Sequence, residues 1–477
     1  MKILHKNDEN RINQVQMVSI DSLVPKNHLL RKIDETIDFS FIYDLIEDKY
    51  CLDNGRPSID PIVLFKIIFL KYIFGIKSMR QTIREIEVNV AYRWFLGYDF
   101  YDKIPYFTTY GQNYKRRFKE TDIFEKIFVN ILSQAEKQGF VDEKIQFVDS
   151  THVKAHANRH KNIEVKIEKK AKKYHSQLNE EIKKDRELKG KKELRPTNGK
   201  EIVKKVESTT DKESGLFHKG EHKEVFAYSV QTSCDKNGWV LACRSYAGNL
   251  HDSETFMDFY EKDLKKFEVR KIVMDAGYKT PAIAKMLIDD KIQPVLPYTS
   301  PKGKRKEGFY PRDYVYDEYY DCYICPENEI IKYSTTTREG YREYRSDRKK
   351  CSKCKNLEKC TESKNKQKVI TRHIWKSYLE ECEEYRYTKR GKEEYKRRKE
   401  TIERTFGTVK EYHGFRYTNE KGKAKMQIKA LLTFACLNMK KLANMMSRLG
   451  RKKPNFLIFR EIYIKFKILT NSQIIFN

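Results

Sequence analysis

Two acidic residues of this sequence, Asp149 and Asp275, each follow a short apolar run rich in strand-forming residues, Ile145–Val148 and Lys271–Met274. Acids at strand ends suit two-metal chemistry, because sheet packing fixes their positions while the adjacent loops open a cleft. If the two strands are neighbours, the carboxylates converge. The alternative is that each aspartate is only a polar residue that terminates a strand.

A third acid, Glu403, lies in a segment with helical character, seven residues before Lys410. At about 100° per residue this spacing puts a metal-binding acid and a phosphate-pairing cation on one helix face. Two aspartates and a glutamate can hold two divalent ions about 3.5–4 Å apart for phosphoryl transfer. The alternative is an exposed charged helix whose buried face is Phe406 and Val409.

Five of the ten cysteines fall between residues 322 and 360. Cys322-x2-Cys325 and Cys351-x2-Cys354 are two knuckles that could supply four thiolates to a structural zinc ion. The stretch between the knuckles is longer than the commonest zinc spacing, so free thiols in a β-rich insert are the alternative. The identity of the fourth ligand stays open, with Cys360 close by.

The elements that must position these residues change along the chain. Helical patterns dominate the first 140 residues, and a short turn at Gly75 followed by the capping sequence Ser78-x-x-Gln81 is typical of a helix-turn-helix reader or of a plain helical bundle. Strand signals follow from Lys144, in the order strand, hairpin pair, helix, strand, helix, strand. That order predicts an α/β fold with a ribonuclease-H-like mixed sheet.

The predicted domains follow from these changes in pattern. They are a helical N-terminal DNA-binding domain (1–140), the first part of the ribonuclease-H-like core (141–300) with a helical lysine-rich insertion (159–205), a Cys-rich insertion (301–390), the glutamate helix with a C-terminal helix (391–449), and a basic then apolar tail (450–477).

The charge balance indicates a polyanionic partner. Lysine and arginine total 97 against 68 acidic residues, a formal net charge of +29. Nucleic acid is the first candidate, because phosphate neutralisation supplies most non-specific DNA affinity. The start of the chain is polar, and lysines interrupt its most apolar stretch, 61–76. We therefore expect an intracellular protein with reduced or metal-bound cysteines and no membrane partner.

Four motifs occur in one order along the chain, and together they resemble the DDE transposases of bacterial insertion sequences. They are Phe147-Val-Asp-Ser-Thr-His-Val-Lys154, Gly248-Asn-Leu-His-Asp-Ser253, Met274-Asp-Ala-Gly-Tyr278 and Ile402-Glu-Arg-Thr-Phe-Gly-Thr-Val-Lys410. The resemblance covers about residues 15–446. The long gap before Glu403 is similar to the branch that carries an inserted domain there. That branch has the helix pattern Tyr-x2-Arg-x3-Glu-x6-Lys; Lys410 matches it, whereas Tyr395 and Arg398 lie one residue off.

The resemblance implies that Asp149, Asp275 and Glu403 bind two Mg²⁺ (or Mn²⁺) ions. It also implies that water and then a DNA 3′-hydroxyl act as nucleophiles, in cleavage at the terminal inverted repeats of a transposon and in transfer into target DNA. The partners would be double-stranded DNA and further copies of the chain, since joining two ends needs two sites. The location would be the bacterial cytoplasm, at the nucleoid.

In a single straight helix over residues 395–412, helical geometry decides which cations share a face with Glu403. Lys396 and Lys399 lie within about 40° of Glu403, so we expect them to contact DNA phosphates in the same cleft. Arg398 lies about 140° away and should point elsewhere. The remaining cations predicted to bind DNA are Lys410, Arg404, Arg116 and Arg117.

Two other functions remain open at this level. One is a catalytically inactive, zinc-containing DNA-binding regulator, against which the presence of all three acids argues. The other is a general metal-dependent nuclease, which cleavage confined to specific terminal repeats would exclude.

Overall fold

The computed structural model describes residues 15, 17–50, 58–168, 174–195, 202–219, 223–298 and 308–451. Contacts divide the chain into two units. The first takes the chain up to Val141 with Thr405–Glu420 and the chain from Ala424; the second takes Asp142–Arg404 and Lys421–Lys423. The sequence-based division differs, because it keeps 391–449 with the core. Beyond Arg451, the predicted tail lies outside the described residues.

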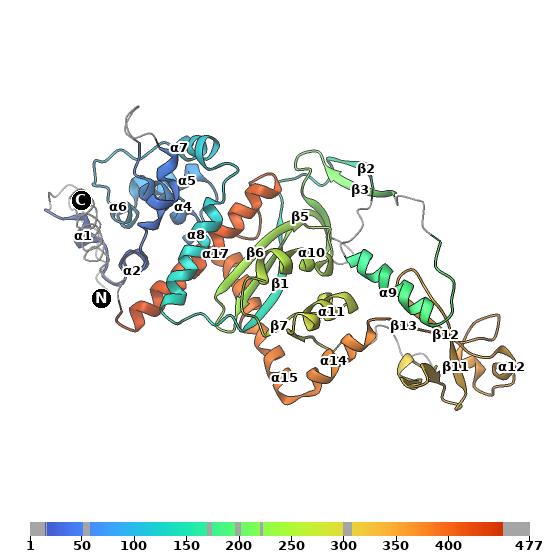
Figure 1. The fold of residues 1–477 in the computed structure, drawn as a ribbon. Coiled ribbons are helices and arrows are strands. Elements are labelled where there is room, and N and C mark those ends of the chain that lie inside the picture. The colour runs from blue at the N-terminus through green and yellow to red at the C-terminus, as the bar shows by residue number, and fades with distance from the viewer. Residues whose placement is uncertain are drawn as a thin grey trace, which may run out of the picture. The chain divides into compact units, whose positions relative to one another are not determined.

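In the described part of the first unit, the regular secondary structure is helical (Figure 1). Its most buried N-terminal helix is α4 (Pro61–Ile73), which begins where the Asp60 carboxylate accepts a hydrogen bond from the Ile62 amide at 2.7 Å. Proline suits the first helical position because it has no amide hydrogen to satisfy there. The other helices are α1 (Ile20–Leu23), α2 (Leu29–Thr36), α3 (Phe41–Ile46), α5 (Met79–Val88), α6 (Val90–Leu96), α7 (Thr108–Asn113), α8 (Ile123–Lys137) and α17 (Lys423–Arg448).

The turn between α4 and α5 is built as the sequence predicts. Ser78 caps α5, its hydroxyl accepting a hydrogen bond from the Gln81 amide at 3.1 Å. Gly75 adopts a φ of +64°, and a Cβ there would lie 2.9 Å from the carbonyl oxygen of Tyr412. The turn therefore lies against neighbouring backbone. Its use as a DNA reader stays a prediction.

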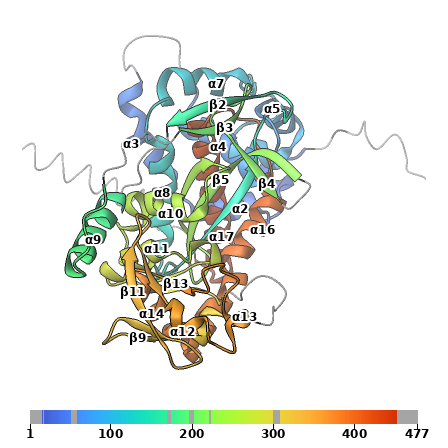
Figure 2. The ribbon, with the colours of Figure 1, turned by 90° about the vertical axis from the view of Figure 1, so that its right-hand side faces the viewer.

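The second unit is built around a six-stranded mixed sheet with the order β4-β5-β1-β7-β8, in which β6 also pairs with β5 (Figures 1 and 2). Strand β1 is antiparallel to β5 and parallel to β7, and β7 is parallel to β8. The antiparallel strands come first and the parallel ones follow, so the predicted ribonuclease-H-like sheet is confirmed. The strands are β1 (Ile145–Lys154), β4 (Gly215–Lys219), β5 (Lys223–Asp235), β6 (Val240–Ala247), β7 (Lys271–Val273) and β8 (Gln293–Val295).

Two helices supply the apolar side chains that cover this sheet. They are α10 (Asp252–Phe259), continued by a π-helical turn η4 (Tyr260–Leu264), and α11 (Pro281–Asp289). Phe256 and Ile283 are fully buried in one cluster with Val148 of β1 and Ile272 of β7. Burying such side chains contributes roughly 1.5–3 kcal/mol each, which holds β1 and β7 rigidly beside one another.

The sequence led us to expect a helical insertion at 159–205, but this segment is not helical throughout. It contains an antiparallel ribbon of β2 (Asn162–Glu168) and β3 (Ile202–Ser208), with α9 (Tyr174–Leu188) between them. In β2, Ile163, Val165 and Ile167 alternate with charged residues. A period of two is the pattern of a strand, and the abundance of lysine hides it.

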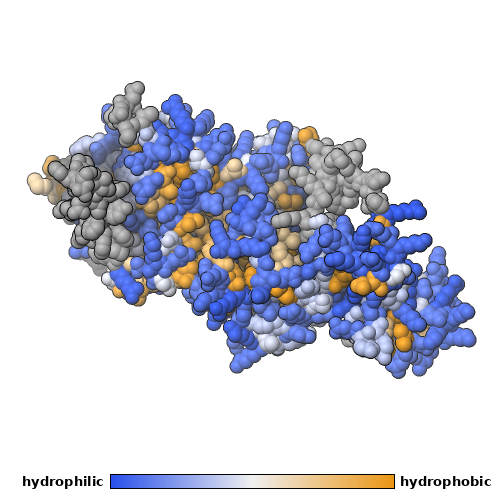
Figure 3. Space-filling model, viewed as in Figure 1, coloured by the Kyte–Doolittle hydropathy of each residue, from blue (hydrophilic) through white to orange (hydrophobic). Residues whose placement is uncertain are grey.

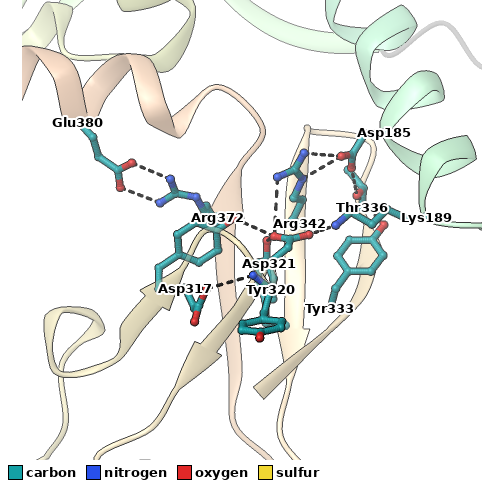
Figure 4. Close-up of polar contacts among 12 residues, drawn as sticks. Asp185, Lys189, Asp317, Tyr320, Asp321, Tyr333, Thr336, Arg342, Arg372 and Glu380 are labelled. Atoms are coloured by element: carbon teal, nitrogen blue, oxygen red, sulfur yellow. Dashed lines mark hydrogen bonds and ion pairs between the residues drawn. The ribbon is translucent and has the colours of Figure 1, made fainter. Parts of the chain in front are cut away.

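The Cys-rich insertion forms its own sheet, in the order β13-β12-β11-β10-β9. The strands are β9 (Val315–Asp317), β10 (Cys322–Ile324), β11 (Ile330–Thr336), β12 (Tyr341–Arg345) and β13 (Val369–His373), with short helices α12 (Arg348–Cys351) and α13 (Leu357–Cys360). Helix α9 is tied to this sheet: Asp185 accepts hydrogen bonds from Thr336 and Arg342 (Figure 4). The two insertions thus form one structure.

The segment around Glu403 is not the single straight helix that we predicted. After α14 (Lys376–Tyr387) come α15 (Lys389–Lys396), a 3₁₀ turn η7 (Arg397–Lys399) and α16 (Ile402–Tyr412). The Thr401 hydroxyl donates to the Arg397 carbonyl at 2.8 Å. Such a bond from a threonine back to the preceding turn competes with regular helix geometry and bends the chain.

The face drawn in Figure 3 is largely hydrophilic, as a chain with 35% charged residues requires.

Among the described helices, none is both long enough and apolar enough to cross a membrane.

Candidate active site

Asp149 and Asp275 lie level with each other where two parallel strands separate. The last pair between β1 and β7 is Phe147 with Val273, and each aspartate stands two residues beyond it. The two carboxylates lie near enough for the charge of Asp275 to raise the pKa of Asp149. The predicted position of Asp149 at a strand end is wrong. Strand β1 continues to Lys154 because it stays paired with β5.

The surroundings of Asp149 change its acidity. Burial raises the pKa of Asp149 from its ordinary 3.8 to about 6; the Arg398 guanidinium opposes this rise, and Asp275 adds to it. The Asp149 Oδ1 atom accepts a hydrogen bond from the Ser150 amide at 2.8 Å. A carboxyl group that burial and a specific charge partner bring towards neutral pKa is a candidate functional group.

Arg398 is the cation that joins the acids. Its Nη2 donates to Asp149 Oδ2 at 2.6 Å, and its Nη1 lies 3.8 Å from Glu403 Oε1. Only 6% of the residue is exposed. The expectation that Arg398 points away from the site is therefore wrong, because the turn η7 replaces a straight helix and redirects this side chain. Tyr395 lies beside it, its hydroxyl 3.4 Å from Nη1.

Asp252 is a fourth acid of the site, and sequence reasoning gave it no role. Burial raises the pKa of Asp252, and the charge of Asp275 raises it further. Gln231 Nε2 donates to Asp252 Oδ1 at 3.3 Å and accepts, through its Oε1, from the Tyr278 hydroxyl at 2.8 Å. The signal in the sequence was an acid at the first position of a helix, where the dipole stabilises negative charge.

Glu403 is the most open of the three predicted acids, with 47% of its side chain exposed. The predicted DNA-binding cations Lys396, Lys399 and Arg404 belong to the same unit and are exposed. They are thus available to a large anion that approaches Glu403.

The other predicted DNA-binding cations belong to the first unit. They are Lys410, Arg116 and Arg117. The Arg117 guanidinium lies over the Tyr50 ring at 4.2 Å, and its Nε donates to the Lys49 carbonyl at 3.2 Å. Arg117 therefore has a structural role, whereas Arg116 is exposed.

The site has the donor chemistry of a magnesium centre but not the arrangement of a loaded one. In the described part of the chain, no three His, Cys, Asp or Glu side chains converge closely enough to hold a metal ion. Carboxylate oxygens are the ligands that Mg²⁺ prefers, and Asp149, Asp275 and Glu403 supply them. The Arg398 guanidinium takes up one of these carboxylates. The residues fit the ion if the Arg398 guanidinium releases the Asp149 carboxylate.

The structure brings one cysteine of the first predicted knuckle together with both cysteines of the second, and leaves Cys322 out. Cys325, Cys351 and Cys354 line one cavity of about 50 Å³, together with Cys360. Cys322 does not line it; it lies beside a different hollow with Lys189 and Lys332.

Comparison with known proteins finds two transposase families in the chain. Residues 18–116 match a family described as "Transposase domain (DUF772)", and residues 324–443 match one described as "Transposase DDE domain". No curated protein matches the chain. Among solved structures, it is similar to a piggyBac transposase in a synaptic complex with hairpin DNA, at 10% identity and a TM-score of 0.35, over 92% of this chain and 80% of that one.

The two family matches flank the central sheet, and the second contains Glu403. Asp149, in β1, and Asp275, two residues after β7, lie outside both matched segments. The chain thus carries a transposase domain at its start and a transposase DDE domain towards its end.

Proposed function

We propose that this chain is a transposase that cuts DNA at the ends of a transposon and joins those ends to target DNA in a single carboxylate site, Asp149, Asp275 and Glu403. The observation that supports it most is the register of β1 and β7, which brings the two aspartates level beyond their last pair. Arg398 connects Asp149 to Glu403, so residues far apart in sequence meet in one place.

The three carboxylates would hold two Mg²⁺ or Mn²⁺ ions. When bound, such ions supply Lewis-acid stabilisation of the attacking and leaving oxygens. Asp149 must give up its proton to bind, and its raised pKa means that it does so close to neutrality. Arg398, released from Asp149, keeps a positive charge beside the reacting phosphate. A water and then a DNA 3′-hydroxyl would attack in turn.

The DNA would be held by the predicted DNA-binding cations of both units. Lys396, Lys399 and Arg404 are the candidates in the unit that carries the acids, and Lys410 and Arg116 are candidates in the other. Each phosphate that they neutralise releases counterions and strengthens binding at low salt. Two transposon ends require two sites, so the working form would be an oligomer on DNA. Its place of action would be the bacterial nucleoid.

A nicking assay on a supercoiled plasmid that carries the flanking inverted repeats tests this function. The wild-type chain should cut in Mg²⁺ at the repeat ends, and Asp275→Asn should not. Binding without cutting would support a DNA-binding regulator instead. Cutting that ignores the repeats would support a general nuclease.

A further inference from the structure

The sheet of the Cys-rich insertion has two faces, and its cysteines divide between them. Tyr323 of β10 pairs with Ile331 of β11, and both lie in the buried cluster on one face. Cys322 pairs with Lys332. Successive residues of a strand point to opposite faces, so Cys322 points away from Tyr323 and from that cluster.

Four other cysteines gather on the first face. Cys325 and Cys360 pack against the buried cluster there. With Cys351 and Cys354 they line the cavity of about 50 Å³, here called the cysteine cavity. Burial raises the pKa of Cys351, its hydrogen bond to Ser346 lowers it, and the other three thiols each raise it. The Cys351 thiol is therefore within electrostatic reach of the other three, although among the described residues no three side chains yet converge on a metal position.

Local backbone structure presents each of these thiols to the cavity. Cys325 opens a tight turn in which Asn328 takes a φ of +57° and the Glu329 amide donates to the Cys325 sulfur at 3.4 Å. Cys351 ends α12 and Cys360 ends α13. An amide that donates to a sulfur favours its thiolate form, which is the form that binds metal.

The cysteine cavity suits a small cation better than an organic ligand. Pockets for organic ligands usually measure about 300–1,000 Å³, several times its volume. Two lysines, Lys350 and Lys368, line it together with three acids, Glu327, Glu329 and Asp347. Two sulfurs are now engaged elsewhere: Cys351 donates to the Ser346 hydroxyl at 3.1 Å, and Cys360 lies 3.1 Å from the Tyr314 hydroxyl. Rotation about their Cα–Cβ bonds would turn them inwards.

The sheet of the insertion also lacks a large apolar core of its own. Its buried hydrophobic cluster has five members, of which three are tyrosines. Modules with so small a core usually need a metal or disulfides for stability. A metal would join the β10–β11 turn to α12 and α13, which follow β12 in sequence.

We propose that Cys325, Cys351, Cys354 and Cys360 bind one structural zinc ion in the cysteine cavity, and that Cys322 is not a ligand. The site lies in the insertion and is independent of the catalysis proposed above. Its donors are four thiolates, the set that favours zinc in tetrahedral geometry over magnesium.

Metal analysis of the full-length, reduced protein and of three variants tests this ligand set. The wild-type chain should carry about one zinc ion, as a site of four thiolates binds. Cys360→Ser and Cys354→Ser should lose most of it, whereas Cys322→Ser should keep it. Cobalt in place of zinc should give the intense visible bands of tetrahedral thiolate coordination in the wild type and in Cys322→Ser. No zinc in the wild type, or retention by Cys360→Ser with loss by Cys322→Ser, overturns the proposal.

A measurement on the wild type alone covers the case in which Cys360→Ser does not fold. Thiol alkylation is mapped by peptide mass with and without a zinc chelator. The four proposed ligands should gain reactivity together when zinc is removed, while buried Cys322 stays unchanged. Alkylation that the chelator does not alter, or disulfides among these cysteines in the freshly purified chain, contradicts the proposal. Neither readout requires DNA or catalytic activity, so the result is independent of the proposed function.

Discussion

The Arg398 guanidinium donates to the Asp149 carboxylate across 2.6 Å, although 249 residues separate the two in sequence. Arg398 belongs to the turn η7 and Asp149 to the middle of β1. This ion pair holds the turn η7 against β1. It also neutralises an acid that a metal ion would otherwise use, so binding of the ion and the position of Arg398 must be coupled.

Asp275→Asn should abolish cleavage while leaving DNA binding nearly intact. A neutral amide is a poor ligand for Mg²⁺, and Lewis-acid stabilisation is worth several kcal/mol, so the rate should fall by roughly 10³-fold or more. Single-turnover cleavage and a gel-shift titration measure the two effects. Asp289→Asn, on the exposed surface of α11, is the matched control and should cut normally. Mg²⁺-dependent strand transfer by Asp275→Asn would remove this residue from the site.

Arg398→Gln should destabilise the fold, and Lys399→Gln should not. Removing one partner of a buried ion pair costs about 3–5 kcal/mol, because the other charge stays buried. Lys399 is exposed, so its loss should change stability by no more than about 0.5 kcal/mol. Urea unfolding measures both.

The pair Arg398–Asp149 can be isolated with a double-mutant cycle. Asp149→Asn combined with Arg398→Gln should cost less than the sum of the single changes, by about 1 kcal/mol or more. Additive effects would mean that the two side chains do not interact. In DNA binding, Lys399→Gln should have the larger effect of the two single changes. It should reduce the salt slope of binding by about one, whereas Arg398→Gln should change that slope little.

Metal affinity should fall as the pH drops through about 6. The pKa of Asp149 is raised to about 6 by burial, so below that value its protonated form competes with the ion. In the metal-free protein the same shift stabilises the fold below the unfolded value of 3.8, and this contribution is lost as the pH rises through about 6. Calorimetric titration with Mn²⁺ on both sides of that pH measures the first effect. A variant with Asn at position 149 should bind weakly and show neither trend.

Asp252→Asn should slow cleavage by about 10–100-fold, the usual effect of changing a group that orients metal ligands. Tyr278→Phe should have a smaller effect in the same direction, since Tyr278 reaches Asp252 only through Gln231. Cleavage rates at several Mg²⁺ concentrations distinguish an effect on metal binding from one on folding. A rate for Asp252→Asn equal to that of the wild type would restrict this acid to a structural role.

The sequence alone predicted the order of the core strands other than β4, and it singled out Asp149 and Asp275 but not Asp252. Apolar runs that end near Asp149 and Asp275 are local patterns, and local patterns reveal strands whatever lies around them. The capping of α5 by Ser78 was equally readable, because capping depends on neighbouring residues only.

Only the tertiary structure decided which side chains meet. Helical periodicity predicted the wrong face for Arg398. The hydrogen bond from Thr401 to the Arg397 carbonyl and the ion pair of Arg398 with buried Asp149 stabilise a bent chain here instead of a regular helix. The spacing of the knuckle predicted that Cys322 and Cys325 act together. The pleat of β10 instead turns Cys322 to the opposite face, and Cys360, at the end of α13, lines the cavity with Cys325. Sequence spacing limits where a side chain can be, whereas its partners depend on pairing and packing between segments distant in the chain.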